Sequence, residues 1–291
     1  MAPLSPVRTA VIPAAGLGTR LLPATKAIPK ELLPIGAVPA MQFILEECHA
    51  SGIHRLVVVV SEHKDNLVRY LTPDPALLTL RKEGPNRNLQ RLEELLSDLE
   101  IHFVTQDEPR GLGHAVLMAR DEVEEASFAV LLPDDLYPGE EDGIVELERF
   151  GDGGVALGLI EVAPNEVMRY GIVAGSRNGD DVAVTDVIEK PPVERAPSTL
   201  AIIGRYILPA AIFDVLDDQR AGAGGEIQLT DAIRTLIARG VPARGRVLGG
   251  LRLDIGDLGG YLMAEKNWLA QPRGQGAGEP GEQAPTGTSP R

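Results

Sequence analysis

The 291-residue sequence has few of the features that would place a protein in a membrane or outside the cell. Its single cysteine, Cys48, cannot form an internal disulfide and lies in an apolar helical pattern, which favours a buried, inert thiol over a reactive one. The longest apolar runs, residues 56–60 and 128–132, are far shorter than the roughly 18 residues that a membrane helix needs. Residues 1–8 lack the basic start and apolar stretch of a secretion signal. We therefore expect a cytoplasmic protein without a membrane span.

Positive charge is also scarce. The chain has 28 Lys and Arg residues against 42 Asp and Glu residues, which gives a net charge of -14. Because affinity for nucleic acid depends mainly on basic side chains at phosphates, this balance argues against a nucleic-acid partner. An anionic ligand would have to meet a local group of cations. Lysines are compact, mobile charges suited to phosphate oxygens, and three of them, Lys26, Lys30 and Lys190, lie in proline-framed motifs.

Several common catalytic and cofactor patterns are missing. The five histidines show no metal-ligand spacing, and no Ser, His and Asp constellation is evident. Gly16 and Gly18 have the first spacing of a dinucleotide fingerprint, but Leu21 stands where its third glycine belongs. No Gly-Lys-Ser/Thr follows, as a Walker A loop would require. The sequence therefore argues against a triad hydrolase, a nicotinamide dehydrogenase and a P-loop enzyme.

Short β-branched runs alternate with longer amphipathic segments from residue 8 onward, as in proteins whose strands are joined by crossover helices. This rhythm predicts an α/β fold with a doubly wound, mixed and mainly parallel sheet flanked by helices. The strand candidates are residues 9–13, 55–60, 101–105, 128–132, 155–162, 171–174, 182–188 and 200–207. The helix candidates are residues 39–51, 64–71, 113–125, 209–217, 229–238 and 258–269.

Two segments depart from this alternation. Residues 72–99 are charged and proline-bounded and contain a helical pattern at residues 89–99, which predicts a helical insertion serving as a lid or an oligomer contact. Residues 271–291 consist mostly of Gln, Gly, Pro, Ser and Thr and have too few apolar side chains to offset the entropy of ordering. We expect them to form a disordered tail.

The segment from residue 11 to residue 34 carries the strongest signal for a ligand. Its glycine turn at Gly16 directly follows a strand candidate, so backbone N–H groups can approach an anion. Arg20, Lys26 and Lys30 follow in a stretch whose prolines exclude a long helix. A bare Gly-x-Gly is more often an ordinary strand-exit loop with surface cations, but the extended pattern favours a phosphate cradle with basic arms.

Carboxylates stand where two strand-like runs end. Asp134 and Asp135 follow residues 128–132, and Asp254 follows a run at residues 246–253. Ligands of open α/β sheets bind beyond the carboxyl ends of strands, so these distant acids can meet there. Magnesium suits one or two carboxylates together with substrate phosphates and water. Each aspartate alone could equally be a turn residue or helix cap, but together with the glycine turn they predict a magnesium site.

Two further motifs offer polar groups to a ligand. Residues 106–115 form a glycine turn between a strand and a helix, and the amide of Gln106 both donates and accepts, as recognition of a base edge requires. A plain loop with a strand cap fits this segment equally well. Glu189 and Lys190 place an acid and a base at the end of an apolar strand, where a solvated strand end is the alternative.

Eight motifs complete the pattern, and they occur in order along the chain. They are AAGLGTR at 14–20, PKE at 29–31, GLGHA at 111–115, LPD at 132–134, VIEKP at 187–191, AIIGRY at 201–206, GGEIQLTD at 224–231 and LDIGD at 253–257. Over residues 8–270 the chain resembles the bacterial UTP:glucose-1-phosphate uridylyltransferases, within the sugar-1-phosphate nucleotidyltransferase superfamily. The resemblance implies a Rossmann-like, nucleotide-diphospho-sugar transferase fold in one catalytic domain at residues 1–270.

The resemblance also implies a reaction, in which magnesium assists in-line attack of glucose-1-phosphate on the α-phosphate of UTP to give UDP-glucose and pyrophosphate. A homodimer or homotetramer is implied as well. Two alternatives remain: a thymidylyltransferase acting on glucose-1-phosphate, because uracil and thymine differ by one methyl group, and a noncatalytic paralogue that binds sugar nucleotides.

The family's functional residues map onto matching positions here. The implied roles are phosphate binding in catalysis for Arg20, Lys30 and Lys190, nucleotide contacts for Ala15, Gly16, Glu31, Gln106 and Gly111, glucose contacts for Gly171, Glu189 and Gly204, and magnesium binding for Asp134 and Asp254. The chain departs from the family pattern at Ala37 and Val38, at Thr199 and at Leu258, none of which is among those residues.

Overall fold

The computed structural model describes residues 7–74, 76–79, 86–139, 143–148, 150, 153–222 and 225–271. The strands are β1 (Thr9–Pro13), β2 (Pro34–Ile35), β3 (Val38–Pro39), β4 (Arg55–Val60), β5 (Glu100–Thr105), β6 (Ser127–Leu131), β7 (Asp135–Leu136), β8 (Val155–Glu161), β9 (Gly171–Asn178), β10 (Asp181–Glu189), β11 (Leu200–Pro209), β12 (Ala243–Val247) and β13 (Leu253–Asp254). The α-helices are α1 (Ala40–Ala50), α2 (Asp65–Tyr70), α3 (Ala76–Thr79), α4 (Arg87–Asp98), α5 (Leu112–Met118), α6 (Val145–Glu148), α7 (Ile212–Asp218), α8 (Leu229–Ala238) and α9 (Leu258–Leu269). Short 3-10 helices are η1 (Thr19–Leu21), η2 (Ala24–Lys26), η3 (Lys30–Leu32), η4 (Arg120–Glu122), η5 (Pro164–Arg169) and η6 (Val193–Arg195).

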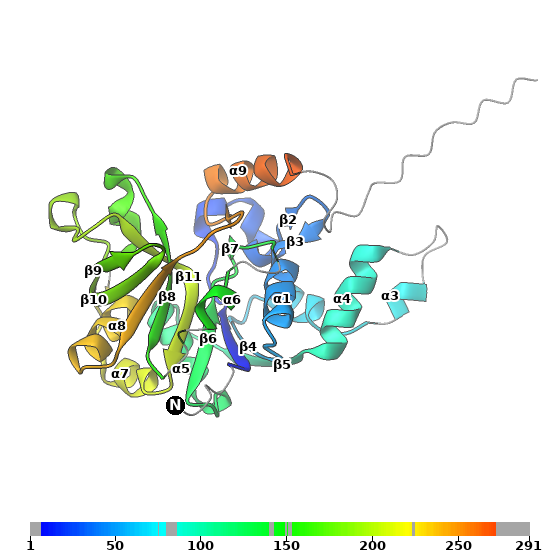
Figure 1. Ribbon diagram of the computed structural model, residues 1–291. Helices are drawn as coiled ribbons and strands as arrows, with labels where there is room; N and C mark the ends of the chain where they lie inside the picture. The colour runs from blue at the N-terminus through cyan, green and yellow to red at the C-terminus, as the bar shows by residue number, and fades with distance from the viewer. Residues whose placement is uncertain are drawn as a thin grey trace, which may run out of the picture.

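One nine-stranded sheet runs through the molecule in the order β5-β4-β1-β6-β11-β8-β12-β10-β9 (Figure 1). The strands β5, β4, β1 and β6 are parallel. From β11 onward the pairings are antiparallel except that of β8 with β12. β9 also meets β11, with Ile172 opposite Ala201, so the last five strands close on one another. The mixed α/β sheet predicted from the sequence is confirmed.

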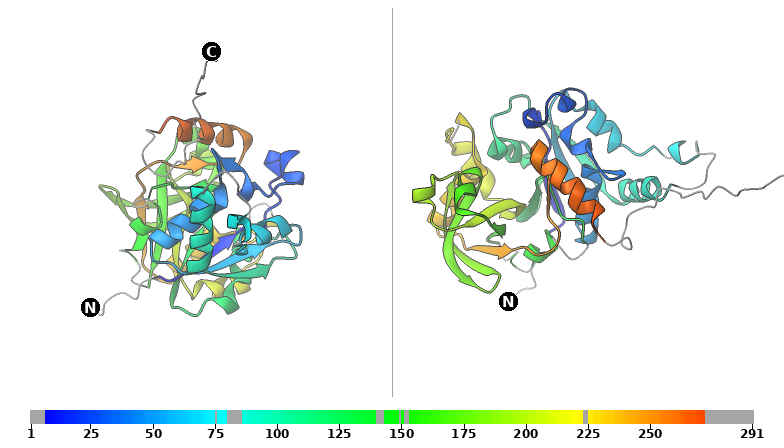
Figure 2. Two further views of the ribbon diagram at one scale, coloured as in Figure 1. Left: turned by 90° about the vertical axis from the view of Figure 1, so that its right-hand side faces the viewer. Right: turned by 90° about the horizontal axis from the view of Figure 1, so that it is seen from above.

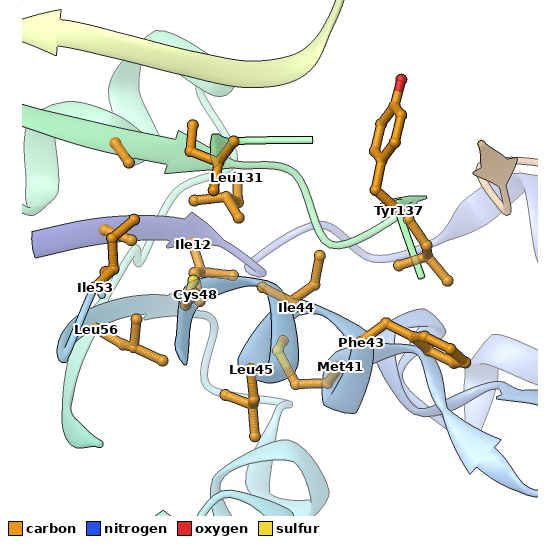
Figure 3. Packing of buried hydrophobic residues seen from close by; sticks show 14 of the residues in the cluster. Ile12, Met41, Phe43, Ile44, Leu45, Cys48, Ile53, Leu56, Leu131 and Tyr137 are labelled. Atoms are coloured by element: carbon orange, nitrogen blue, oxygen red, sulfur yellow. The ribbon is translucent and has the colours of Figure 1, made fainter. Parts of the chain in front are cut away.

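Both faces of the parallel half are buried, which explains the unbroken apolar runs of its strands. In β4, Leu56, Val58 and Val60 belong to one hydrophobic cluster, whereas Val57 and Val59 belong to another. The first cluster packs α1, α2 and α4 onto the sheet, and the second packs α5, α7 and α8 onto the opposite face. Figure 3 shows side chains of α1 in the first cluster packing against β1 and β6. Helices therefore cover the sheet on both sides, as a doubly wound fold requires.

Helix α9 lies between the C-terminal strands and the N-terminal helices in both the front and the top view (Figures 1 and 2). The Tyr261 hydroxyl donates to the Pro34 carbonyl at 2.9 Å, and the Trp268 ring packs edge-on against Phe43. At its N-terminus, the Asp257 side chain caps the helix by accepting from an N–H of the first turn. The cap anchors the chain just after Asp254, so docking of α9 helps to place the end of β13.

Most predicted elements occur with their ends moved by a few residues, and β1, β4, α8 and α9 have the predicted bounds. Two predictions were wrong. The run at residues 246–253 is not one strand, because the chain turns at Gly249 and Gly250, the latter with φ 76°, and only Leu253–Asp254 pairs again. The helix predicted at residues 113–125 ends at Met118 and continues as the tighter turn η4.

The predicted insertion is helical in its described parts, α3 and α4. The Asn86 side chain caps α4 by accepting from the Leu89 N–H at 3.1 Å, and three leucines of α4 are buried in the first cluster with α1. Residues 75 and 80–85 of the insertion and residues 272–291 of the predicted tail lie outside the described residues.

The thiol of Cys48 is fully buried in α1, and burial raises its pKa, which confirms the inert reading. Across the described ranges no helix is both long and apolar enough to cross a membrane.

A buried ion pair joins α1 to β11. Arg205 donates to the two carboxylate oxygens of Glu47 at 2.7 and 2.6 Å, and the side chains are 0% and 2% exposed. Glu47 also accepts from the Ile144 N–H at 2.8 Å, and Arg205 donates to the carbonyls of Leu132 and Gly204. The pair therefore holds the chain directly before Asp134.

We expect Glu47→Gln to lower the free energy of unfolding by about 3–5 kcal/mol, because it leaves the Arg205 charge buried without a counter-ion. The matched control is Arg120→Gln, which breaks the exposed pair with Asp214 and should change stability by less than about 0.5 kcal/mol. Urea unfolding at neutral pH measures both values. Equal, small effects would show that the buried pair contributes no more than a surface pair.

Candidate active site

Predicted ligand residues gather at one edge of the sheet. Gly16 follows β1, Gln106 follows β5 and Asp134 follows β6, and these strands run parallel. The carboxyl ends of parallel strands meet at the same edge, which is where open α/β sheets bind ligands. The Gln106 N–H donates to the Val60 carbonyl at 2.8 Å, which ties the end of β5 to β4.

The glycine turn leads into three short 3-10 helices, η1 to η3, in place of a long helix, as its prolines predict. Ala15 is buried, whereas Gly16 is exposed and has open space where a Cβ would lie. Gly18 has φ 63°, and its carbonyl accepts from the Thr25 hydroxyl at 2.8 Å. Arg20 is exposed in η1. The turn thus leaves both its backbone at Gly16 and a cation open to a ligand.

Lys30 and Asp134 form an ion pair across the two motifs, with Nζ 2.5 Å from Oδ2. Burial is the largest single influence and by itself would lower the pKa of Lys30 and raise that of Asp134, but the opposite charges and hydrogen bonds around each group together outweigh it. The pKa of Lys30 therefore lies above its ordinary value and that of Asp134 below it. Arg20 adds a further positive charge near both. The structure thus brings Arg20 and Lys30 close to Asp134, the predicted metal ligand.

Asp254 lies beside Asp134, although the two are far apart in the sequence. In the ladder between β13 and β7, Asp254 stands opposite Asp135, and the Ile255 N–H donates to the Asp134 carbonyl at 2.8 Å. A Cβ on Gly256 would lie 3.2 Å from Oδ1 of Asp254 and 3.6 Å from Oδ2 of Asp134. The two carboxylates thus flank one small space, and two carboxylates with room for phosphate oxygens fit a divalent cation.

Arg252 is a site residue that the sequence reasoning missed. Its guanidinium donates to both oxygens of Asp135 at 2.6 and 3.1 Å and to Asp254 at 3.2 Å. Asp135 also accepts from the Gly204 N–H at 3.0 Å. Arg252 directly precedes β13 and stands two residues before Asp254, a spacing that places side chains on one face of an extended segment and is the signal that could have found the pair.

Gln106 and Gly111, the predicted base contacts, lie together with His114. The Gln106 Nε2 atom is 2.8 Å from His114 Nδ1 and donates to the Gly111 carbonyl at 3.4 Å. Gly111 has φ 106°, and a Cβ there would lie 2.8 Å from the Ile227 carbonyl, so only glycine fits. His114 was not predicted as a site residue, although it follows Gly-Leu-Gly in the same motif.

The predicted glucose contacts fall into two groups. Gly171 and Glu189 are adjacent, since a Cβ on Gly171 would lie 3.3 Å from Oε2 of Glu189, and Lys190 pairs with Glu189 at 3.2 Å. Lys190 has φ 44°, a left-handed backbone that is strained for lysine. Gly204 lies instead against Leu132 and Asp135.

Buried Tyr206 lies within electrostatic range of Glu189, Asp135 and Asp134. Burial raises the pKa of Tyr206, and the charges of Glu189, Asp135 and Asp134 raise it further. Glu189 and Asp134, from the predicted glucose and metal groups, are therefore both close enough to Tyr206 to influence its pKa.

Glu31 lies behind Lys30 with its side chain 0% exposed. Its Oε2 accepts from Lys64 Nζ at 2.6 Å, whereas Oε1 is buried and has no hydrogen-bond partner among the described residues. Burial raises the pKa of Glu31, and the ammonium groups of Lys64 and Lys30 oppose this effect without cancelling it. Lys64 was missed because nothing in the sequence connects it with Glu31.

The chain matches the model of the family described as nucleotidyl transferase over residues 9–271. It is 43% identical over 272 residues to a UTP–glucose-1-phosphate uridylyltransferase of Bacillus subtilis, covering 91% of each chain. Among solved structures, a UDP-glucose pyrophosphorylase complexed with UDP-glucose superposes with TM-score 0.81 at 33% identity, covering 90% of this chain and 98% of that one. A UTP-bound enzyme of the same name from Acinetobacter baumannii gives TM-score 0.79 at 34% identity, covering 92% and 95%.

Lys64→Met tests the pair behind Lys30. Without Lys64 the folded-state pKa of Glu31 rises further above the unfolded value of about 4.3. The variant therefore keeps its stability at low pH, where Glu31 is protonated, and loses it as the pH rises through the folded-state pKa of Glu31. Relative to the wild type, we expect its free energy of unfolding to fall by about 3–5 kcal/mol at pH 8 and by less at pH 5.

Denaturant unfolding at the two pH values checks this prediction. Lys26→Met removes the same charge from an exposed site in η2 and should show no such dependence. A loss for Lys64→Met that is equal at both pH values would contradict the role of the Glu31 charge.

Proposed function

The chain belongs to the nucleotidyl transferase family, and we propose that it transfers the uridylyl group of UTP to glucose-1-phosphate, giving UDP-glucose and pyrophosphate. The observation that carries this proposal is the convergence of Lys30, Asp134 and Asp254 beside the glycine turn. The names of the relatives support the choice of substrates, because five curated relatives at 40–43% identity are UTP–glucose-1-phosphate uridylyltransferases. The same fold is seen in a solved structure complexed with UDP-glucose.

The reaction forms a bond between a phosphate oxygen of glucose-1-phosphate and the α-phosphorus of UTP, while the bond from that phosphorus to pyrophosphate breaks. A phosphate monoester has a second pKa of about 6, so the nucleophile is largely a dianion at neutral pH and needs no general base. The barrier is mainly repulsion between anions and their alignment. Cations at fixed positions are therefore the machinery that this transfer needs.

Arg20 and Lys30 hold the triphosphate, and Lys190 holds the phosphate of the sugar. Lys30 is kept protonated by Asp134, and Arg20 is exposed at the mouth of the turn. The strained backbone of Lys190 is typical of residues whose conformation is set by function. Together these side chains supply the local positive charge that a protein of net charge -14 must have at an anion site.

Asp134 and Asp254 hold a divalent cation, which we propose to be Mg²⁺. Bound there, the cation would neutralise the charge that accumulates on the triphosphate oxygens. Lys30 pairs with Asp134 at 2.5 Å, and Arg252 pairs with Asp254 at 3.2 Å. These ion pairs orient both carboxylates.

The two substrate pockets follow from the remaining site residues. Ala15, Gly16, Glu31, Gln106 and Gly111 contact the nucleotide, and Gly171, Glu189 and Gly204 contact the glucose. Gly16 has open space where a Cβ would lie, and Glu189 is partly exposed next to Gly171, so both can be reached by a ligand. The proposal includes one catalytic domain at residues 1–270, a cytoplasmic location and a homodimer or homotetramer.

The substrate assignment predicts a specific pattern of activity. With UTP, glucose-1-phosphate and Mg²⁺ the purified protein should release pyrophosphate and form UDP-glucose, and chelation of the metal should abolish turnover. The measurement is pyrophosphate release across a panel of nucleoside triphosphates and sugar phosphates. A higher kcat/KM with dTTP than with UTP would make the protein a thymidylyltransferase, and no release with any pair would overturn the enzyme assignment.

The metal assignment predicts that Asp134→Asn and Asp254→Asn each abolish turnover, because a neutral amide cannot replace a carboxylate at the cation. Asp186→Asn is the matched control: it breaks the exposed pair with Arg234 and should leave kcat unchanged. Circular dichroism of each variant verifies the fold. Near-normal activity of both site variants would remove these residues from the metal site.

A further inference from the structure

The amide of Gln106 has one orientation that its neighbours allow. Nε2 lies 3.4 Å from the Gly111 carbonyl, which can only accept, and 2.8 Å from His114 Nδ1. The reverse orientation would place Oε1 against that carbonyl oxygen. Both N–H groups of the amide are therefore used within the protein, and in the described part of the chain Oε1 accepts no hydrogen bond.

The Gly111 carbonyl is itself held firmly. It also accepts from the Ala115 N–H at 3.1 Å, the first bond of α5. The loop on either side pairs with Ile227, whose carbonyl accepts from the Gly113 N–H and whose N–H donates to the Arg110 carbonyl, both at 2.8 Å. Because the Gly111 carbonyl is held in place by these bonds, it fixes the orientation of the Gln106 amide that donates to it.

His114 can accept from Gln106 only as a neutral ring with its proton on Nε2. Its side chain is buried, and burial and then the Arg110 guanidinium lower its pKa, whereas the Glu108 carboxylate and backbone raise it less. The net shift is downward from 6.5, so the ring is neutral at pH 7. A neutral ring with Nδ1 free to accept matches the position of Nε2 of Gln106.

We propose that His114 is a positioning residue that locks the Gln106 amide with Oε1 toward the nucleobase, and that this lock makes the site select uracil over cytosine. The inference rests on the proposed function, in which Gln106 contacts the base. Uracil presents an N3–H donor at the centre of its pairing edge, which Oε1 accepts. Cytosine presents an N3 lone pair there, which would face the lone pairs of Oε1.

The lock matters because a glutamine amide is by itself indifferent to the two bases. A freely turning amide offers Oε1 to uracil and Nε2 to cytosine, so it discriminates little. An amide that cannot turn leaves a buried polar atom unpaired with the wrong base, which is how binding sites reach high selectivity. Thymine has the same N3–H as uracil, so the lock does not separate UTP from dTTP.

Two substitutions of His114 distinguish the effect of its hydrogen-bond acceptor, Nδ1, from the effect of its volume. His114→Asn keeps an oxygen near the position of Nδ1, whereas His114→Leu fills similar space with no acceptor. For each variant and the wild type, kcat/KM and the Kd of the nucleotide alone are measured with UTP, CTP and dTTP. The measure of the lock is the ratio of UTP to CTP, and the ratio of UTP to dTTP is the internal control.

We expect His114→Leu to lower the UTP to CTP ratio by about tenfold or more, mainly through Kd and KM, and to leave the UTP to dTTP ratio unchanged. His114→Asn should retain most of the wild-type ratio. In a Gln106→Ala background, His114→Leu should have no further effect on the ratio, because it acts only through the amide. An unchanged ratio in His114→Leu, or equal losses in both His114 variants, would overturn the proposal.

A measurement on the wild type covers the case in which His114→Leu does not fold. The ¹⁵N chemical shifts of His114 at pH 7 should show an unprotonated Nδ1 and a protonated Nε2, and a proton on Nδ1 would refute the lock.

Failure of the proposed function can be distinguished from failure of the lock. A protein that turns over no UTP yet binds UTP over CTP in a His114-dependent manner would refute the reaction and support the lock.

Discussion

β7 and β13 pair over only two residues each, and this pairing places Asp135 directly opposite Asp254. Like charges at opposed positions of a ladder repel, so the pairing depends on a cation between them. Arg252 provides it by donating to both carboxylates at once. Once that pairing exists, the Ile255 N–H donates to the Asp134 carbonyl, and the carboxylates of Asp134 and Asp254 flank the same space. Arg252 thus stabilises the contact between the segment that follows β6 and the segment that contains β13.

Pairing of basic side chains with carboxylates also explains how a protein of net charge -14 can bind polyanions. Net charge acts over the whole surface, but a site responds to the charges within a few ångströms. Arg20 and Lys30 come from the 3-10 helices that follow the glycine turn, Lys190 directly follows β10, and Arg252 directly precedes β13. Each of the two lysines is paired with a carboxylate, so their positive charge is balanced within the protein. In the proposed reaction, substrate phosphates would compete with these carboxylates for the lysines.

Sequence patterns could predict elements whose signal is local. The apolar run of β4 and the amphipathic period of α8 belong to the segments themselves, and both were found with their bounds. The end of β12 and the two residues of β13 depend on a glycine turn and on a partner strand elsewhere in the chain, so periodicity merged them. The family motifs predicted from the sequence alone that Asp134 and Asp254 belong to one site. Lys64 and His114 were missed because each acts on a polar side chain elsewhere in the chain, and such partnerships are visible only in three dimensions, whereas Arg252 had a local signal in its spacing from Asp254.

The buried ion pairs around the site are better explained by the backbone positions that they fix than by a gain in the free energy of unfolding. An ion pair such as that of Glu47 and Arg205 loses in desolvation much of what it gains in attraction, and apolar residues of similar size could often stabilise the fold as well. Apolar residues could not, however, hold the Leu132 carbonyl or the Ile144 N–H, which the pair does. The chain segment so fixed leads directly into Asp134. Transfer between two anions requires alignment to within fractions of an ångström, and a carboxylate that hangs from a fixed backbone meets that demand where one on a free loop would not.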